Sequence, residues 1–189
     1  MITKSRILQR CYSNDNIKGI VLNIDSGGGS GLGMRLLTET ISKRNKPIVA
    51  FVSDMAASAA YGIASGADII VANSDYARVG SIGTYMNIVS YVEKFKKEGI
   101  NIIEVYASAS KDKNKDYYDA LKGDTKAVQK TADTYNEMFL SMIETNRKDK
   151  LTKDRSVWGT GKMYFAPEAL ELGLIDNIDS FSNILNYFV

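Results

Sequence analysis

The chain contains no histidine in its 189 residues and only one cysteine, Cys11. Without histidine, neither a serine–histidine–aspartate triad nor a histidine-based metal site can form. A single cysteine excludes an internal disulfide, and with no histidine beside it a zinc centre is not expected. No metal or cofactor is therefore predicted. The longest apolar runs, such as Ile48–Val52 and Ile69–Ala72, are far shorter than the roughly 20 residues that span a bilayer.

What the chain does contain is typical of a globular protein, with 44% hydrophobic and 24% charged residues. The formal net charge is +2, and acidic and basic residues are mixed along the sequence. This balance gives no electrostatic reason to expect a nucleic acid or a membrane surface as partner. No signal-peptide core follows Met1. The length predicts one domain over residues 1–189, with enough chain to bury a core.

The order of the periodic segments predicts an α/β fold. Apolar, β-branched segments predict strands at residues 17–24, 48–52, 68–72, 100–106 and 163–165. Amphipathic segments predict helices at residues 3–13, 34–44, 58–65, 90–98, 125–147 and 166–172, with a last helix after Asp176. The alternation predicts a mostly parallel sheet with flanking helices. Because a helix precedes the first strand, we expect the chain to lack N-terminal strands and to be part of a longer chain.

Ser58 is the first candidate for chemistry, because it lies among alanines between a predicted strand and a predicted helix. By spacing alone, a helix N-cap is the favoured interpretation. The segment Gly27–Gly29 follows another predicted strand and does not fit a phosphate loop or a dinucleotide fingerprint. One backbone N–H from this segment and one from Ala59 would suit an oxyanion hole.

A serine nucleophile needs a base, and here lysine is the natural candidate. A free lysine has a pKa near 10.4 and is charged at neutral pH, but burial can lower that pKa by several units. Lys111, Lys113 and Lys115 lie in the polar segment after residues 100–106. Spacing alone does not choose among them, and a solvated basic loop is the alternative interpretation.

Five segments taken in order resemble one known family. They are Ile24–Gly29, Met55–Tyr61, Ala67–Ala72, Arg78–Gly83 and Gly161–Asp176. Together they resemble the signal peptide peptidase A family of serine peptidases, which includes phage head-maturation proteases. The resemblance covers nearly the whole chain and implies the Clp protease/crotonase-like fold. It also implies a Ser/Lys dyad.

Residue by residue, Ser58 matches the nucleophile of that family and Lys111 matches its general base. Ser81 matches a serine that hydrogen-bonds the lysine. Gly28 and Gly29 match the glycines of the oxyanion loop, to which the amide of Ala59 adds a donor. Two positions depart from the family pattern. Gly27 stands where the family has proline, and Ala59 stands where it usually has glycine, although the alanine still offers its N–H.

The resemblance implies a serine endopeptidase that takes an extended polypeptide. Its members form rings in which neighbouring protomers can share the dyad, so a homo-oligomer is expected. The phage or prophage branch, which cleaves scaffold or capsid-associated segments in the host cytoplasm or prohead, is favoured over the membrane-bound branch. The alternatives are a peptidase that degrades cleaved signal peptides, an inactive structural or assembly subunit of the same fold, and a crotonase-type acyl-thioester enzyme.

Overall fold

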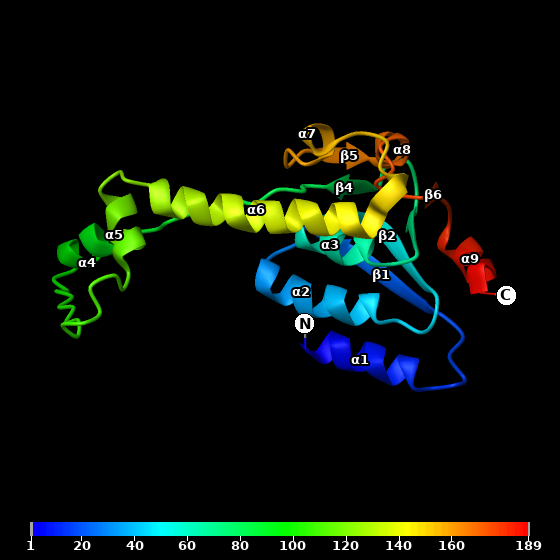
Figure 1. The fold of residues 1–189 in the computed structure, drawn as a ribbon, viewed down its shortest axis with the longest axis horizontal. Coiled ribbons are helices and arrows are strands. Elements are labelled where there is room, and N and C mark those ends of the chain that lie inside the picture. The colour runs from blue at the N-terminus through cyan, green and yellow to red at the C-terminus, as the bar shows by residue number, and fades with distance from the viewer. Residues whose placement is uncertain (1, 189) are drawn as a thin grey trace. The chain divides into compact units, whose positions relative to one another are not determined.

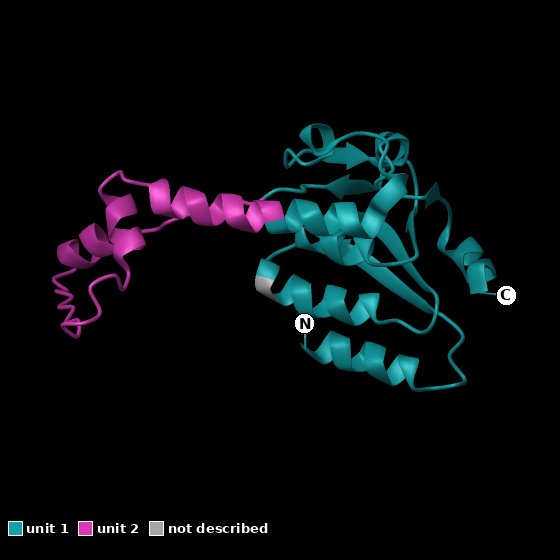
Figure 2. Cartoon of the chain, in the orientation of Figure 1, with its two compact units in different colours: residues 1–83, 138–189 teal, residues 84–137 magenta. Residues whose placement is uncertain are grey.

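The computed structural model describes residues 2–188, apart from the side chain of Leu32. The chain divides into two compact units, shown in Figure 2. Unit 1 comprises residues 1–83 and 138–189, and unit 2 comprises residues 84–137. The single domain that the length predicts stays a prediction, because a compact unit is not by itself an independently folding one.

Unit 1 is built on a six-stranded sheet (Figure 1). In chain order the strands are β1 (Ile20–Ser26), β2 (Ile48–Ala57), β3 (Ile69–Ala72), β4 (Arg78–Gly80), β5 (Met163–Phe165) and β6 (Asn177–Ile178). Strands β1, β3 and β4 pair with β2 in parallel, β6 pairs with β3 in parallel, and β5 joins β4 antiparallel. This mostly parallel sheet confirms the predicted fold class.

Strand β2 is the centre of the sheet, because its two halves have different neighbours. The first half lies between β1 and β3, and the second half pairs with β4, where Met55 is opposite Arg78. The register between β1 and β2 is interrupted between Ile24 and Ser26. An irregularity of this kind bends a strand, and here it occurs where β1 leads into the glycine segment.

Both faces of the sheet are covered, as is usual for parallel sheets. Along β2, Ala50 and Val52 belong to the larger hydrophobic core, whereas Val49 and Phe51 belong to a smaller cluster on the other face. The ring of Phe51 meets that of Phe181 edge to face, with 5.2 Å between centroids. The continuous apolar run at the start of β2 is therefore explained by burial on two sides.

The helices of unit 1 cover these faces. They are α1 (Ile2–Tyr12), α2 (Gly31–Ser42), α3 (Ala59–Ser65), α7 (Arg155–Trp158), α8 (Ala166–Glu171), α9 (Phe181–Ile184) and the C-terminal part of α6 (Lys126–Arg147). In Figure 1, α1 lies beside α2, and α2 packs on α3. The predicted long helix is confirmed as α6, which buries Phe139, Leu140 and Ile143 at helical spacing.

A buried arginine fixes the C-terminal end of α6. Arg147 is 1% exposed, and its guanidinium donates to the carboxylate of Asp176 at 2.8 Å and to the carbonyl of Gly173 at 2.7 Å. Asp176 also accepts from the N–H of Ile70 at 2.8 Å and pairs with Lys150 at 2.8 Å. Burial alone would raise the pKa of Asp176, but the hydrogen bonds from Arg147 and Lys150 outweigh it and lower that pKa.

Unit 2 contains two short helices, α4 (Val92–Lys97) and α5 (Lys115–Leu121), and the N-terminal part of α6. The predicted strand at residues 100–106 is wrong, since this segment forms neither strand nor helix. Ile103 and Val105 are 86% and 90% exposed. The β-branched composition suits a strand, but a strand needs a neighbour, and the described part of unit 2 offers none.

Smaller differences concern the element boundaries. β1 begins at Ile20 rather than residue 17, and β2 continues to Ala57. The short strands β4 and β6, the helix α5 and the helical turn α7 were not predicted. Each of these has at most seven residues, too few for a periodic pattern to develop.

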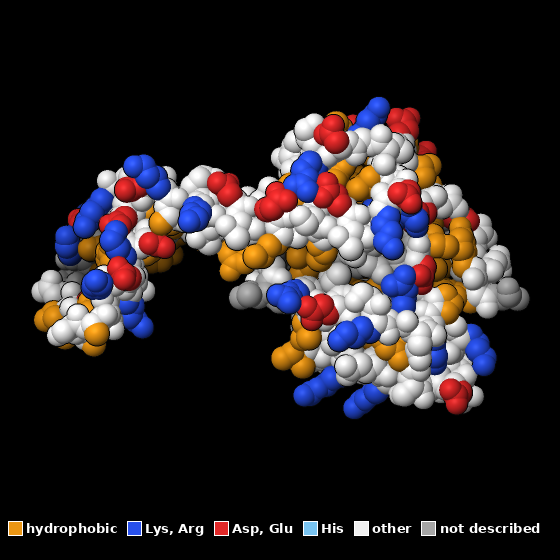
Figure 3. Space-filling model, in the orientation of Figure 1, with side chains coloured by type: hydrophobic (Ala, Val, Ile, Leu, Met, Phe, Trp, Pro, Cys, Tyr) orange, Lys and Arg blue, Asp and Glu red, His pale blue; other side chains and the backbone are white. Residues whose placement is uncertain are grey.

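Acidic and basic side chains lie side by side over much of the face drawn in Figure 3. Within residues 2–188, no helix combines the length and the apolar character needed to cross a membrane. No group of three or more aspartate, glutamate or cysteine side chains in the same residues is arranged to hold a metal ion.

Replacing Arg147 by alanine should lower the free energy of unfolding by about 3–5 kcal/mol, because Asp176 loses its buried partner. Urea unfolding followed by the fluorescence of buried Trp158 measures the change. Folding lowers the pKa of Asp176, so the difference from wild type should shrink as the pH falls below the ordinary value of 3.8. Arg35→Ala, which removes an exposed pair with Glu39, is the control and should leave the midpoint unchanged.

Candidate active site

Ser58 occupies the junction between β2 and α3, where its backbone has φ 52° and ψ −124°. A non-glycine residue is strained in this conformation, and such strain is found preferentially at functional sites. Spacing alone favours a helix N-cap at Ser58, but its side chain makes no capping hydrogen bond in the structure. Ser58 is half-buried and lies at a sharp turn from strand to helix, which is also where α/β-hydrolases carry their catalytic serine.

The glycine segment packs directly against this junction. A Cβ atom placed on Gly28 would lie 2.6 Å from the carbonyl oxygen of Ala57, 2.8 Å from the Cβ of Ser58 and 3.0 Å from the nitrogen of Ala59. Gly28 also has φ +98°. Only glycine is therefore compatible with both the conformation and the close approach. The structure brings together Gly28, Ser58 and Ala59.

The predicted oxyanion donors differ in their present bonding. The N–H of Gly28 donates to the hydroxyl of Ser26 at 3.2 Å, inside the glycine segment. Gly29 follows with φ +143°, and a Cβ there would meet nothing within 4 Å. Ala59 is the first residue of α3, and the first N–H groups of a helix have no acceptor within it. The amides of Gly29 and Ala59 are thus in positions where an outside acceptor could use them.

A second strained turn lies beside Ser58. The N–H of Ser58 donates to the carbonyl of Gly80 at 2.8 Å, which places the turn at Gly80 and Ser81 next to the nucleophile candidate. Ser81 has φ 50°, and its N–H donates to the carbonyl of Lys162 at 2.8 Å. Gly161 donates to the carbonyl of Ile82 at 3.0 Å. The segment around Lys162, which sequence reasoning did not connect with the site, therefore supports this turn.

The base candidates lie elsewhere in the chain. Ser58 belongs to unit 1 and Lys111 to unit 2, where Lys111 is exposed in a series of turns. The structure therefore does not pair the two residues of the predicted dyad within one unit. Lys113 is exposed in the same turns, so the choice between these two lysines stays a prediction.

Two other lysines are poor candidates, because each has a carboxylate partner. Lys115 is hydrogen-bonded to Asp119 one turn along α5, which raises the pKa of Lys115. Lys162 lies 2.8 Å from Glu168, and this hydrogen bond raises the pKa of Lys162. Both shifts oppose the loss of the ammonium proton that a general base requires.

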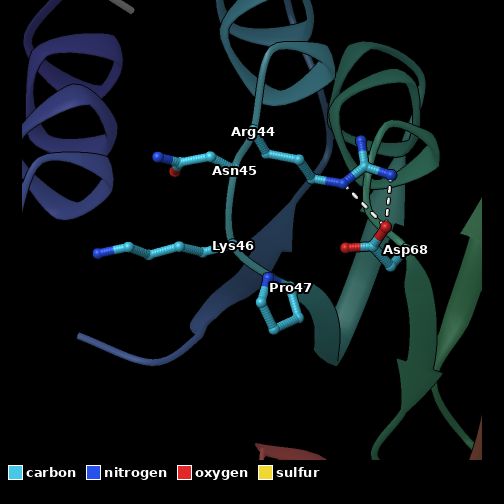
Figure 4. A pocket seen from close by; sticks show the side chains of 5 residues that line it. All are labelled: Arg44, Asn45, Lys46, Pro47 and Asp68. Carbon is cyan, nitrogen blue, oxygen red and sulfur yellow. Dashed lines mark hydrogen bonds and ion pairs between the residues drawn. The ribbon is translucent and has the colours of Figure 1, made fainter. Parts of the chain in front are cut away.

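A cavity of about 300 Å³ lies at the other end of β2 (Figure 4). Arg44 points toward Asp68, and the two form an ion pair, whereas Lys46 points away from both. Asp68 also accepts from the N–H of Ile48 at 2.8 Å. Burial would raise the pKa of Asp68, but the hydrogen bonds from Arg44 and Ile48 lower it. Asp68 thus has hydrogen-bond partners in Arg44 and in the backbone at the start of β2, so these residues have a structural role.

The chain is similar to several known proteins. The family model described as Peptidase family S49 matches residues 40–188. Protease 4 of Haemophilus influenzae is 28% identical over 188 residues, which cover 97% of this chain and 30% of that protein. The head-tail preconnector protein GP5 of Enterobacteria phage P21 is 29% identical over 184 residues, which cover 95% of this chain and 36% of that protein. The chain spans about a third of the length of these two relatives.

Two solved structures show the same fold at low identity. The 1510-N membrane-bound stomatin-specific protease, solved in complex with a substrate peptide, has a TM-score of 0.59 at 18% identity, covering 100% of this chain and 74% of that chain. An enoyl-CoA hydratase/isomerase family member has a TM-score of 0.55 at 15% identity, covering 98% of this chain and 61% of that chain. The Clp protease/crotonase-like fold predicted from the sequence is thereby confirmed.

If Ser58 is a nucleophile and Gly28–Gly29 offer oxyanion donors, replacing Gly28 by alanine should reduce labelling of Ser58 by a fluorophosphonate probe by about a hundredfold or more, because the methyl group displaces the glycine segment from the serine. Gly27→Ala is the matched control, since a Cβ there meets nothing within 4 Å and φ is not positive. Circular dichroism should show both variants folded. Equal labelling of the two variants would contradict a role for the close approach at Gly28.

Proposed function

This chain belongs to peptidase family S49, and on that basis we propose that it is a serine endopeptidase with Ser58 as nucleophile and Lys111 as general base. The observation that supports the proposal most directly is the strained junction at Ser58 with Gly28 packed against it. The likeness to an enoyl-CoA hydratase/isomerase concerns the fold alone, whereas the family match concerns peptidases.

In the proposed reaction, neutral Lys111 removes the proton from the Ser58 hydroxyl as the oxygen attacks the carbonyl carbon of a peptide bond. The resulting ammonium group then returns this proton to the leaving nitrogen as the C–N bond breaks. An ester between Ser58 and the acyl half of the substrate remains. Water attacks this ester, Lys111 takes a proton from the water, and the proton passes to the departing serine oxygen.

The negative charge of each tetrahedral intermediate falls on the former carbonyl oxygen. We assign the donors to the amide of Ala59 and to an amide of the segment Gly28–Gly29. To act as an oxyanion donor, the N–H of Gly28 must leave its present acceptor, the Ser26 hydroxyl. The N–H of Gly29, the next residue in the same loop, is the other candidate donor. Backbone donors that are already in place stabilise the developing charge without reorganising. Such electrostatic stabilisation is the largest contribution to the rate enhancement in many acyl-transfer enzymes.

Lys111 must lose its charge before it can act. The side chain is exposed in the structure. We propose that assembly of several copies covers Lys111 and completes the dyad, since removal of a lysine from water disfavours its charged form. Ser81, in the turn tied to Ser58, would hydrogen-bond the lysine and orient it.

For the substrate, we propose an extended polypeptide. The similarity to the preconnector protein of phage P21 over 95% of the chain supports scaffold or capsid-associated segments of a phage or prophage, cleaved in the prohead. Degradation of cleaved signal peptides, which the resemblance to the signal peptide peptidase A family implies, is the alternative. Mass spectrometry of the products from a phage scaffold protein and from a signal peptide would separate the two.

Ser58→Ala should abolish labelling by a fluorophosphonate probe, and Lys111→Ala should slow it by about 10²–10⁴-fold, because proton transfer to a positioned base contributes that much. Lys113→Ala and Lys162→Ala are the controls and should label at the wild-type rate. Labelling that persists in Ser58→Ala would disprove the serine mechanism. Loss of labelling in Lys113→Ala but not in Lys111→Ala would move the base to Lys113.

If assembly completes the site, the specific activity should rise with protein concentration. Peptide cleavage is measured over a dilution series, and the mass of the species at each concentration is measured by analytical ultracentrifugation. Mixing inactive Ser58→Ala with inactive Lys111→Ala should restore part of the activity when neighbouring copies share the dyad. Constant specific activity from a monomer would show that the dyad forms within one chain.

A further inference from the structure

The segment that carries Lys111 is compact although it contains no regular element. Successive turns close residues 107–115. The N–H of Ser110 donates to the carbonyl of Ala107 at 2.8 Å, that of Lys113 to Ser110 at 3.1 Å, and that of Lys115 to Asp112 at 3.2 Å. Lys111 therefore lies in a defined backbone path.

No strand anchors this path. Residues 100–106, which lead into it, form neither strand nor helix. The helices on either side, α4 and α5, have six and seven residues, which is too short for either to be stable by itself. The position of the Lys111 turns must therefore depend on side-chain interactions within unit 2.

Four polar side chains join the two ends of these turns. The carboxylate of Glu104 accepts from the hydroxyls of Tyr106, at 3.3 Å, and of Tyr118. The side-chain amide of Asn114 donates to the hydroxyl of Tyr106 at 3.3 Å. Tyr106 directly precedes the turns, Asn114 ends them, and Tyr118 lies in the following helix. The network thus connects the entry of the Lys111 segment to its exit.

We propose that Glu104, Tyr106, Asn114 and Tyr118 form a clamp that positions Lys111 for proton transfer. This inference rests on the proposed function, because it assigns positioning residues to the base named there. None of the four is a catalytic residue. Their role is to hold the lysine-bearing turns in one arrangement, so that the ammonium or amine group reaches the serine at a fixed place.

The chemistry of the clamp suits this role. A hydrogen bond to a carboxylate is stronger than one between neutral groups. The hydrogen bond to Glu104 raises the pKa of Tyr118, so the phenol remains a donor at any physiological pH. Asn114 has φ 59°, a left-handed conformation that asparagine tolerates better than most residues. Its backbone thereby ends the turns while its side chain bonds back to Tyr106.

The test removes single hydroxyls. Tyr106→Phe should slow acylation of Ser58 by a fluorophosphonate probe by about tenfold or more, since small displacements of a positioned group cost rate steeply. Tyr118→Phe should slow it as well. Tyr117→Phe is the matched control, because its hydroxyl donates to the carbonyl of Val89 and is not part of the clamp. This control should react at the wild-type rate.

A double-mutant cycle separates positioning from general stability. In a Lys111→Ala background, Tyr106→Phe should cause no further loss, because there is no longer a base to position. The proposal is overturned if Tyr106→Phe reacts like wild type, if its loss persists in the Lys111→Ala background, or if Tyr117→Phe loses as much. Persistent labelling of Ser58→Ala would instead overturn the serine mechanism itself, so the two failures are distinguishable.

Discussion

The hydrogen bond from the Ser58 N–H to the carbonyl of Gly80 is the interaction on which the arrangement in unit 1 depends. It connects Ser58, the residue after β2, to Gly80, the last residue of β4, and Ser58 has a positive φ at this point. The same backbone position leaves space for Gly28 but for no larger residue. One constraint therefore places the serine, the glycine segment and Ser81 around a common point.

The second constraint is chemical and concerns the lysine. Unit 1 contains a lysine next to the Ser81 turn, Lys162, but Glu168 keeps it charged. The lysine that the family resemblance selects, Lys111, is carried by unit 2 instead. The proposed nucleophile and the proposed base therefore belong to different compact units of the chain.

Much of unit 1 could be predicted because its elements have strong local patterns. The strand that begins at Ile48 and the long helix that ends at Arg147 lie where their apolar patterns indicate. The segment at residues 100–106 shows the limit of such patterns, since its β-branched residues favour a strand that has no neighbour to pair with. Likewise, the spacing around Ser58 predicts a cap, whereas the distortion that makes it a candidate nucleophile arises from tertiary contacts with Gly28 and Gly80.

The conformation of Ser58 also bears on how the sequence can change. Glycine would adopt φ 52° without the cost of order 1–3 kcal/mol that a side chain incurs there. Selection for thermal stability alone would therefore favour glycine at position 58. The backbone strain of serine at this position is the kind of cost that accompanies a trade-off between stability and activity.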